Sequence, residues 1–462
     1  MIKEKYFGTR DFYKATLAIA VPIMIQNGIS NFVNLLDNLM IGRVGTDALS
    51  GVAIANQLIF VFYLLIFGAT AGVGIYTAQY YGMGDTKGVR DTFRTKIVFN
   101  VIFCIASIIV FYTFSEPLIN LFLQGEGDSV NVENTLAIGK QYMNVMLIGL
   151  IPVGLTNAYS GTLRDCGETR VPMISSIIAI TVNLVGNFIL IYGYFGLPAF
   201  GATGAAIATV ISRFVELGFL AIYTATHGDK HPFIIGAFKH FYIPGNLLWK
   251  FFIRSLPLIL NETLWAMGNT VLTQCYSYRS LDAVAALNIE GTVWNLISVA
   301  FMAMGDAVGI IVGQTLGSGK IDEAKDTARK MIVMTFMFGI ICGLVMVIIS
   351  PFFPMIYNTT PEIKSLATKF LLANGILTPL YSFTHASYFT IRSGGKTVIT
   401  FIFDSCFVWI ISVPTAFILS RYTNIDVVLM LILVQSWELI KCFIGAGIVH
   451  SGIWANNIVE EI

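Results

Sequence analysis

A few carboxylate and amide side chains stand inside long apolar stretches of this sequence, and these residues could do chemistry. Asp37 lies late in an apolar run that begins near residue 14, and Glu262 lies in the apolar run from Ile253 to Gly268. A charged side chain at the centre of a bilayer costs about 2.5–3.5 kcal/mol on insertion scales, so it needs a partner or a function. A carboxyl group in that setting can bind a small cation or exchange a proton.

Two asparagines are candidates to share such work. Asn183 and Asn187 are four residues apart, so their side chains lie on one face of a helix. Amide oxygens beside a carboxylate make an oxygen-only environment, which suits Na⁺ and equally suits a proton-sharing network. Asparagines in membrane helices also serve as plain contacts between helices, and the residues alone leave this alternative open. Asn157 and Thr203 are weaker candidates for the same group.

The composition places these residues in a membrane protein. The chain has 462 residues, of which 56% are hydrophobic and 12% are charged, with a mean hydropathy of +0.75. A soluble domain carries about 25% charged residues, so this chain could not cover the surface of a water-soluble globule. Its apolar runs are continuous and about 20 residues long, which predicts helices and excludes an outer-membrane barrel.

Apolar runs between polar breaks predict an all-α membrane protein with twelve transmembrane helices. Twenty of the 28 Lys and Arg residues fall in the N-terminal segment and in alternate loops that share its side of the membrane, which predicts that both termini are cytoplasmic. The predicted spans are 14–39, 52–81, 95–115, 136–161, 171–193, 201–225, 250–275, 286–316, 328–350, 366–390, 397–420 and 427–450.

The sequence matches itself when it is shifted by 235 positions. The segment TAQYYGMGDTKGVRDTFRTKI mirrors VGQTLGSGKIDEAKDTARKMI, and Pro22 falls on Pro257. Beyond a longer acidic loop the shift becomes 228, so that Arg164 falls on Arg392. Six helices is an even number, so both halves enter from the same side, and a pseudo-twofold along the membrane normal relates the two six-helix bundles. The predicted parts are an N-terminal lobe (1–226), a cytoplasmic linker (227–249) and a C-terminal lobe (250–462).

Several segments resemble the multidrug and toxin extrusion family of cation-coupled drug antiporters. These segments are DNLMIGRVGTDALSGVAIANQL, RDCGETRVPM, VNLVGNFILIYG and the NET of LPLILNETLWAMGN, and the resemblance covers about residues 14 to 450. It implies two six-helix bundles around a central cavity. It also implies that Asp37, with Asn183 and Asn187, binds the coupling cation. Some family members have Asp where Asn187 stands, so the resemblance does not say whether the ion is Na⁺ or H⁺.

The resemblance also implies roles in the second half. Glu262 matches an acidic position that partners a cation or a cationic drug. The family's carboxylate on the tenth helix is missing, and the Arg392 register places Tyr381 there. His385, one turn further on, could titrate instead. Glu290, an ionisable residue of the predicted eighth helix that ranks lower, is added to this second-half group on its position alone and not on the resemblance.

Other residues have simpler interpretations. Pro22 and Pro257 are expected to bend their helices and to act as hinges. Two i, i+3 pairs of opposite charge, Arg213 with Glu216 and Glu438 with Lys441, are expected to be structural ion pairs. Asp306 and Asp404 are further ionisable residues within predicted helices and rank below the groups above.

Together these features predict a multidrug efflux antiporter of the bacterial cytoplasmic membrane. It would export amphipathic or cationic drugs in exchange for Na⁺ or H⁺, without a cofactor or nucleic acid, and as a monomer. The sequence contains no Walker A, HExxH or GxSxG motif, so we expect neither ATP hydrolysis nor an enzyme. A flippase for lipid-linked oligosaccharides is the alternative, but it would need a cationic cavity, and the ionisable residues at membrane depth are mainly acidic.

Overall fold

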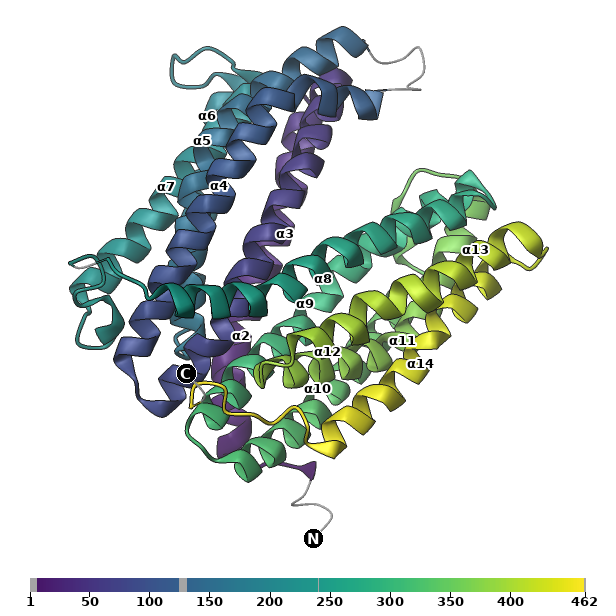
Figure 1. Cartoon of the computed structure of the whole chain (residues 1–462). Helices are drawn as coiled ribbons and strands as arrows, with labels where there is room; N and C mark the ends of the chain where they lie inside the picture. The colour runs from purple at the N-terminus through teal and green to yellow at the C-terminus, as the bar shows by residue number, and fades with distance from the viewer. Residues whose placement is uncertain (1–5, 124–130, 240, 461–462) are drawn as a thin grey trace. The chain divides into compact units, whose positions relative to one another are not determined.

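The computed structural model describes residues 6–123, 131–239 and 241–460, and every regular element in these ranges is helical (Figure 1). The prediction of an all-α protein with twelve long helices is confirmed. The helices of the first half are α2 (Arg10–Gly42), α3 (Thr46–Met83), α4 (Thr86–Leu123), α5 (Val132–Asp165), α6 (Arg170–Tyr192) and α7 (Gly201–Thr226).

The second half repeats this series of six. Its eleventh predicted span is a continuous run of four short elements, two of which are π-helical. The elements are α8 (Gly245–Ser277), α9 (Leu281–Gly317), α10 (Ile321–Ile349), α11 (Pro361–Ser393), the run α12 (Thr397–Phe401), η3 (Ile402–Cys406), η4 (Val408–Ser412) and α13 (Val413–Tyr422), and finally α14 (Val427–Ser451). Two short 3₁₀ helices, η1 (Pro232–Ile234) and η2 (Phe353–Ile356), lie in connections.

Ten of the spans in the described part of the chain are long and apolar enough to cross a membrane. The other two, α8 and α11, are 33 residues long but do not reach the same apolar composition. Polar side chains such as Asn261 and Glu262 in α8, and Asn374 and Thr378 in α11, explain the difference. These two helices therefore carry hydrogen-bonding side chains within spans that the sequence predicts to cross the membrane.

Local sequence signals set several helix ends. The side-chain oxygens of Ser280 and Thr360 accept hydrogen bonds from the backbone N–H groups of Ala283 and Ile363, which caps the N-termini of α9 and α11. Gly84 and Gly319, which match at a shift of 235, adopt φ values of +81° and +77° just after α3 and α9. Only glycine adopts such angles without strain, so the same turn follows the same helix in each half.

The contacts divide the chain into two compact units. The N-terminal unit comprises Ile25–Thr77 and Asp85–Ser255, and the C-terminal unit comprises Met1–Met24, Ala78–Gly84 and Leu256–Ile462. The helices α2, α3 and α8 therefore contribute to both units. In α2 and in α8 the division lies within two residues of Pro22 and of Pro257, respectively. The predicted lobes, 1–226 and 250–462, are continuous in sequence, whereas the contact units are not. The division into these lobes stays a prediction that rests on the repeat.

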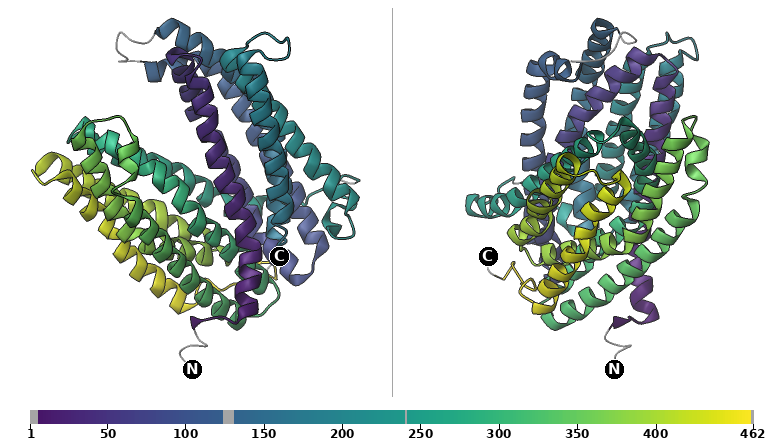
Figure 2. Two further views of the ribbon diagram at one scale, coloured as in Figure 1. Left: turned by 180° about the vertical axis from the view of Figure 1, so that it is seen from behind. Right: turned by 90° about the vertical axis from the view of Figure 1, so that its right-hand side faces the viewer.

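Each unit has an apolar core of its own. In the N-terminal unit, α3, α4, α5 and α7 pack around buried side chains that include Phe62, Ile119 and Met143. In the C-terminal unit, α8, α9, α11 and α14 pack around side chains that include Phe370 and Met430. Figure 2 shows from two sides that the helices within a unit run alongside one another, so each buries an apolar face against its neighbours.

The linker predicted between the lobes is held on α4 by two arginines. Arg94 donates from Nε to the carbonyl oxygen of Ala237 at 2.8 Å and from Nη2 to that of Gly236 at 3.0 Å. Arg90 donates from Nε to the carbonyl oxygen of Phe233 at 3.2 Å. These charged hydrogen bonds fix residues 233–237 against the N-terminal unit, to which this part of the linker belongs.

A pair of repeated glycines lets two helix ends cross within the C-terminal unit. A Cβ atom on Gly317, at the end of α9, would lie 1.9 Å from the carbonyl oxygen of Gln79 in α3. A Cβ atom on Gly82 would lie 1.9 Å from the carbonyl oxygen of Gln314 in α9. These four residues are matching positions of the repeat, so the crossing is itself symmetrical. The shared Gln-x-x-Gly pattern is explained by this close backbone approach.

The C-terminal segment after α14 packs against the crossing of α3 and α9. The side chain of Gln79 donates to the carbonyl oxygens of Ser393 at 2.9 Å and Asn456 at 3.1 Å, and it accepts from the backbone N–H of Ile458 at 2.8 Å. Trp454 is fully buried. One amide side chain thus joins the ends of α3 and α11 and the C-terminal segment.

We predict that Gly317→Val destabilises the protein by at least about 1–3 kcal/mol, the usual cost of overpacking. The new side chain would meet the backbone of Gln79, which cannot move aside as a flexible side chain could. The control is Gly291→Val in the same helix, where a Cβ atom would meet no heavy atom within 4 Å. Thermal unfolding in detergent is the measurement, and equal melting temperatures for the two variants would contradict the crossing.

Candidate functional site

The structure brings together the three residues that the sequence singled out in the first half. Asn187 in α6 donates from Nδ2 to Asp37 Oδ1 in α2 at 2.7 Å. The same Nδ2 is 3.3 Å from Asn183 Oδ1, one helical turn away. The asparagines are 6% and 1% exposed, and Asp37 is half-buried. A carboxylate is therefore held against a buried amide pair inside one unit.

The amide pair is oriented from α7 and keeps one acceptor free. Asn183 donates from Nδ2 to Thr209 Oγ1 at 3.0 Å, which fixes its oxygen toward Asn187. Asn187 Oδ1 is buried and has no hydrogen-bond donor among the described residues. A buried acceptor of this kind is costly unless something satisfies it. Asn187 Oδ1 and the neighbouring Asp37 carboxylate are oxygen ligands of the kind that a small cation prefers.

The positive charge that acts on Asp37 is already paired with a carboxylate. Arg213 in α7 is within electrostatic range of Asp37, but its Nη1 pairs with Glu216 Oε2 at 2.9 Å. The predicted i, i+3 pair on this helix is confirmed. Asp37 accepts its described hydrogen bond from a neutral amide, so its negative charge is only partly compensated.

Two further candidates of the first half are not joined to this cluster by any described hydrogen bond. Asn157 in α5 donates from Nδ2 to the carbonyl oxygen of Val153 in its own helix at 3.0 Å. Thr203 lies half-buried in the first turn of α7. No described hydrogen bond therefore joins Asn157 or Thr203 to Asp37.

The second-half candidates lie on α8, α9 and α11 and do not form one cluster. Glu262 is half-buried in α8. Tyr381 packs edge-to-face on Trp294 with ring centroids 5.2 Å apart, and His385 lies against Phe389 at 4.9 Å. Glu290 Oε1 accepts a hydrogen bond of 2.6 Å from Asn374 Nδ2, and both residues are buried. Sequence reasoning did not identify Asn374 as this partner.

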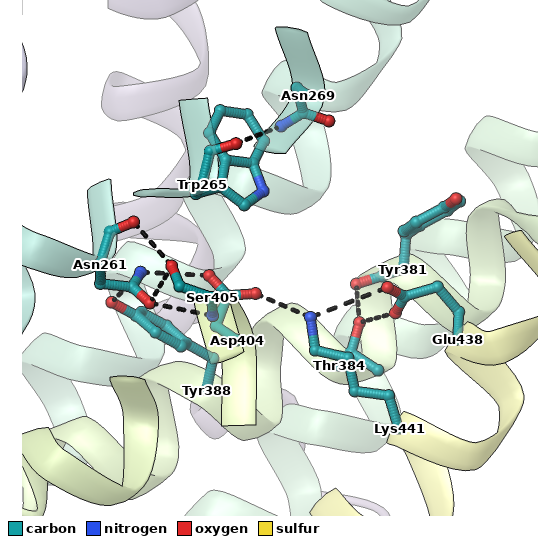
Figure 3. A network of polar contacts seen from close by, with 10 residues as sticks. All are labelled: Asn261, Trp265, Asn269, Tyr381, Thr384, Tyr388, Asp404, Ser405, Glu438 and Lys441. Carbon is teal, nitrogen blue, oxygen red and sulfur yellow. Dashed lines mark hydrogen bonds and ion pairs between the residues drawn. The ribbon is translucent and has the colours of Figure 1, made fainter. Parts of the chain in front are cut away.

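A polar network in the C-terminal unit centres instead on residues ranked low or not considered (Figure 3). Asn261 Nδ2 donates to Asp404 Oδ2 at 3.1 Å, and Lys441 Nζ lies 2.7 Å from Asp404 Oδ1. Lys441 also pairs with Glu438 Oε1 at 3.7 Å, so that predicted ion pair exists but is the longer of the two. Ser405 Oγ donates to the backbone oxygen of Asn261 at 2.7 Å. The signal that could have grouped Asp404, Glu438 and Lys441 is that all three are ionisable residues within predicted membrane helices, whereas the sequence did not single out Asn261.

Comparisons with known proteins support one family for both halves. A family model described as MatE matches residues 22–189 and again residues 257–418. The probable multidrug resistance protein NorM of Thermotoga maritima is 24% identical over 416 residues, which cover 88% of this chain and 86% of that protein. The probable multidrug resistance protein YoeA of Bacillus subtilis is 22% identical over 410 residues, covering 88% and 87%.

Solved structures share the fold. The outward-facing conformation of a multidrug resistance MATE family transporter of the MOP superfamily has a TM-score of 0.83 and 18% identity, covering 95% of this chain and 96% of that one. A MOP superfamily transporter from Pyrococcus furiosus, described as having a binding pocket of reverse polarity, has a TM-score of 0.79 and 17% identity, covering 98% of each chain. At these identities the likeness concerns the fold alone.

The buried Glu290–Asn374 contact leads to a stability prediction. We expect Asn374→Leu to cost about 1–3 kcal/mol of unfolding free energy, because the buried Glu290 carboxyl loses its described donor. The double variant Glu290→Met with Asn374→Leu should recover most of this loss, since both polar groups are then gone. Denaturation in detergent measures both effects. A single variant as stable as the wild type would show that the contact is not maintained.

Proposed function

Because this chain belongs to the MatE family, whose model matches both of its halves, we propose that it is a secondary active multidrug efflux transporter. It exports amphipathic, often cationic drugs and takes up Na⁺ or H⁺ in exchange. The names of its relatives, which are probable multidrug resistance proteins, support the drug substrate. The antiport mechanism is supported by the chemistry of the first-half cluster.

The observation that carries the proposal is the contact between Asp37 and Asn187. A partly compensated carboxylate touches a buried amide whose Oδ1 has no described donor. Na⁺ would be held by these oxygens, whereas H⁺ would neutralise the carboxylate directly. Either ion neutralises a carboxylate whose charge costs free energy in an apolar medium. The electrostatic potential around Asp37 therefore differs strongly between the cation-bound and cation-free protein.

Exchange follows if cation and drug favour different conformations. A ligand shifts an equilibrium only through its differential affinity for the two states. Cation binding at Asp37 changes the packing preferences of α2, and α2 passes from one contact unit to the other within two residues of Pro22. A proline lacks the backbone N–H that would close the helical hydrogen bond, so the helix bends there at lower cost. Coupling between the two ligands is reciprocal by linkage.

The second half supplies groups suited to the drug. Glu262 is half-buried, and its carboxylate can pair with an organic cation. Tyr381 and Trp294 present an edge-to-face aromatic pair on neighbouring helices, and aromatic faces attract cations by about 0.5–2 kcal/mol. His385 is a further polar group on the same helix as Tyr381. These roles for Glu262, Tyr381, His385 and Glu290 belong to the proposal.

The flippase alternative finds less support. Recognition of a lipid pyrophosphate requires cationic side chains that are available to the ligand. Three buried or partly buried cations of the described helices are already paired. These pairs are Lys96 with Asp165 at 2.6 Å, Arg213 with Glu216 at 2.9 Å, and Lys441 with Asp404 at 2.7 Å.

The membrane arrangement follows from the charge pattern of the loops. We place the protein in the bacterial cytoplasmic membrane with both termini in the cytoplasm, in accord with the excess of Lys and Arg on that side. The transporter works as a monomer in this proposal, because each chain carries its own Asp37 cluster. No cofactor takes part beyond the exchanged ion.

We predict that Asp37→Asn lowers cation-driven drug uptake into everted vesicles by about 5–150-fold, the range that is typical of coupling between two ligands. The amide keeps the shape of the side chain but cannot carry the charge that the cation neutralises. The matched control is Asp11→Asn, which makes the same change at an exposed position of α2 and should leave transport unchanged. Uptake driven separately by a Na⁺ gradient and by a pH gradient identifies the ion. Wild-type uptake in the Asp37→Asn variant would remove this residue from the mechanism.

A further inference from the structure

The first half holds a chain of polar contacts that links three helices. Gln26 in α2 donates from Nε2 to Ser176 Oγ in α6 at 2.6 Å. Ser176 donates to Glu216 Oε1 in α7 at 2.7 Å. Glu216 pairs through its other oxygen with Arg213 at 2.9 Å. The order along this network is amide, hydroxyl, carboxylate, guanidinium, and the amide oxygen of Gln26 also accepts a hydrogen bond from Arg164 in α5.

The second half holds a chain of contacts in the same order of helices (Figure 3). Asn261 in α8 donates to Asp404 in η3 at 3.1 Å. Asp404 pairs with Lys441 in α14 at 2.7 Å, and Lys441 approaches Glu438 at 3.7 Å. The order here is amide, carboxylate, ammonium, carboxylate. Two carboxylates share one ammonium group.

The first two members of each network occupy matching positions of the repeat. Gln26 matches Asn261 at the shift of 235 that relates Pro22 to Pro257, and Ser176 matches Asp404 at the shift of 228 that relates Arg164 to Arg392. On the last helix of each half a shift of 222 aligns Glu216 and Leu217 with Glu438 and Leu439, so the acidic residues match, whereas Lys441 falls on Phe219. The networks therefore differ in that the second half carries an additional carboxylate, Asp404, and an ammonium group beside it, Lys441.

The side chain of Lys441 is buried between two carboxylates and two aromatic rings. Its side chain is 7% exposed, and the side chains of Asp404 and Glu438 are 19% and 15% exposed. The ammonium group also lies 5.4 Å from the ring centroid of Phe403 and 6.0 Å from that of Phe407, within range of cation–π attraction. Glu262 and His385 are within electrostatic range of Asp404 as well. A mobile cation could reach Asp404 only by displacing an ammonium that is tethered beside it.

We propose that Lys441 is a built-in counter-cation, which keeps Asp404 and Glu438 from binding a mobile ion. The inference rests on the proposed function, since it concerns how many cations are exchanged. Asp37 and Asp404 differ in the charge of their hydrogen-bonding partners. The described hydrogen-bond donor to Asp37 is a neutral amide, whereas Asp404 has an ammonium at 2.7 Å. In a medium of low dielectric constant, the first carboxylate needs an ion and the second already has one.

The test counts the cations bound to purified protein, using ²²Na⁺ binding for Na⁺ and the pH change of a weakly buffered sample for H⁺. We expect Asp37→Asn to bind one cation fewer than the wild type. Lys441→Gln should bind one more cation, Na⁺ or H⁺, and should keep it when Asp37→Asn is added. Lys441→Arg, which retains the charge, should bind the same number as the wild type. A folded Lys441→Gln variant with no additional Na⁺ or H⁺ would overturn the inference.

A second variant covers the case in which Lys441→Gln does not fold. Asp404→Asn in the otherwise native chain should leave the number of bound cations unchanged, because Lys441 and not a mobile ion neutralises Asp404. Loss of a bound cation in this variant would overturn the inference. If Asp37→Asn binds as many cations as the wild type, the proposed function is contradicted. The comparison of Lys441→Gln with the wild type would still test the inference in that case.

Discussion

Charge that is buried among apolar helices must be neutralised nearby, and this constraint organises the whole structure. Lys96 is fully buried, and its Nζ lies 2.6 Å from Asp165. Arg213 and Lys441 are likewise held by Glu216 and Asp404. Breaking such a pair by removing one partner leaves a charge that neither water nor protein compensates. Asp37 and Glu290 depart from this pattern, since their described hydrogen bonds come from the amides of Asn187 and Asn374. In the proposed function, the Asp37 carboxylate is neutralised by the exchanged ion.

The repeat shows how one scaffold can serve two different electrostatic purposes. The crossing of α3 and α9 preserves Gln79 with Gln314 and Gly82 with Gly317, because the backbones approach too closely for any side chain at the glycines. The matched polar networks differ in their charges, since Asp404 stands where the first half has Ser176 and is paired with Lys441. Backbone geometry tolerates little change, whereas a buried carboxylate can be added if a cation is added beside it. The halves therefore share a fold while their polar networks carry different charges.

Much of the fold could be predicted, because the membrane simplifies the problem. Continuous apolar runs must be helices when no water satisfies the backbone, so the twelve elements follow from composition and length. The local ion pair between Arg213 and Glu216 could also be predicted from i, i+3 spacing. The same rule named Glu438 as the partner of Lys441, and that contact exists at 3.7 Å. The shorter contact, to Asp404 at 2.7 Å, joins residues that are 37 positions apart. Spacing along one helix carries no information about such a pair.

The sequence by itself determined the helical class, the repeat and the buried carboxylates and amides that could do chemistry, since each of these depends on residue type and on spacing within single elements. The tertiary structure alone decided which of those groups meet. In the folded protein Asn187 donates a hydrogen bond to Asp37, and Asn374 donates one to Glu290. Asn261 and Lys441 both contact Asp404. Helices fix the direction of a side chain only about their own axis, and the neighbour that it faces depends on how separate helices pack.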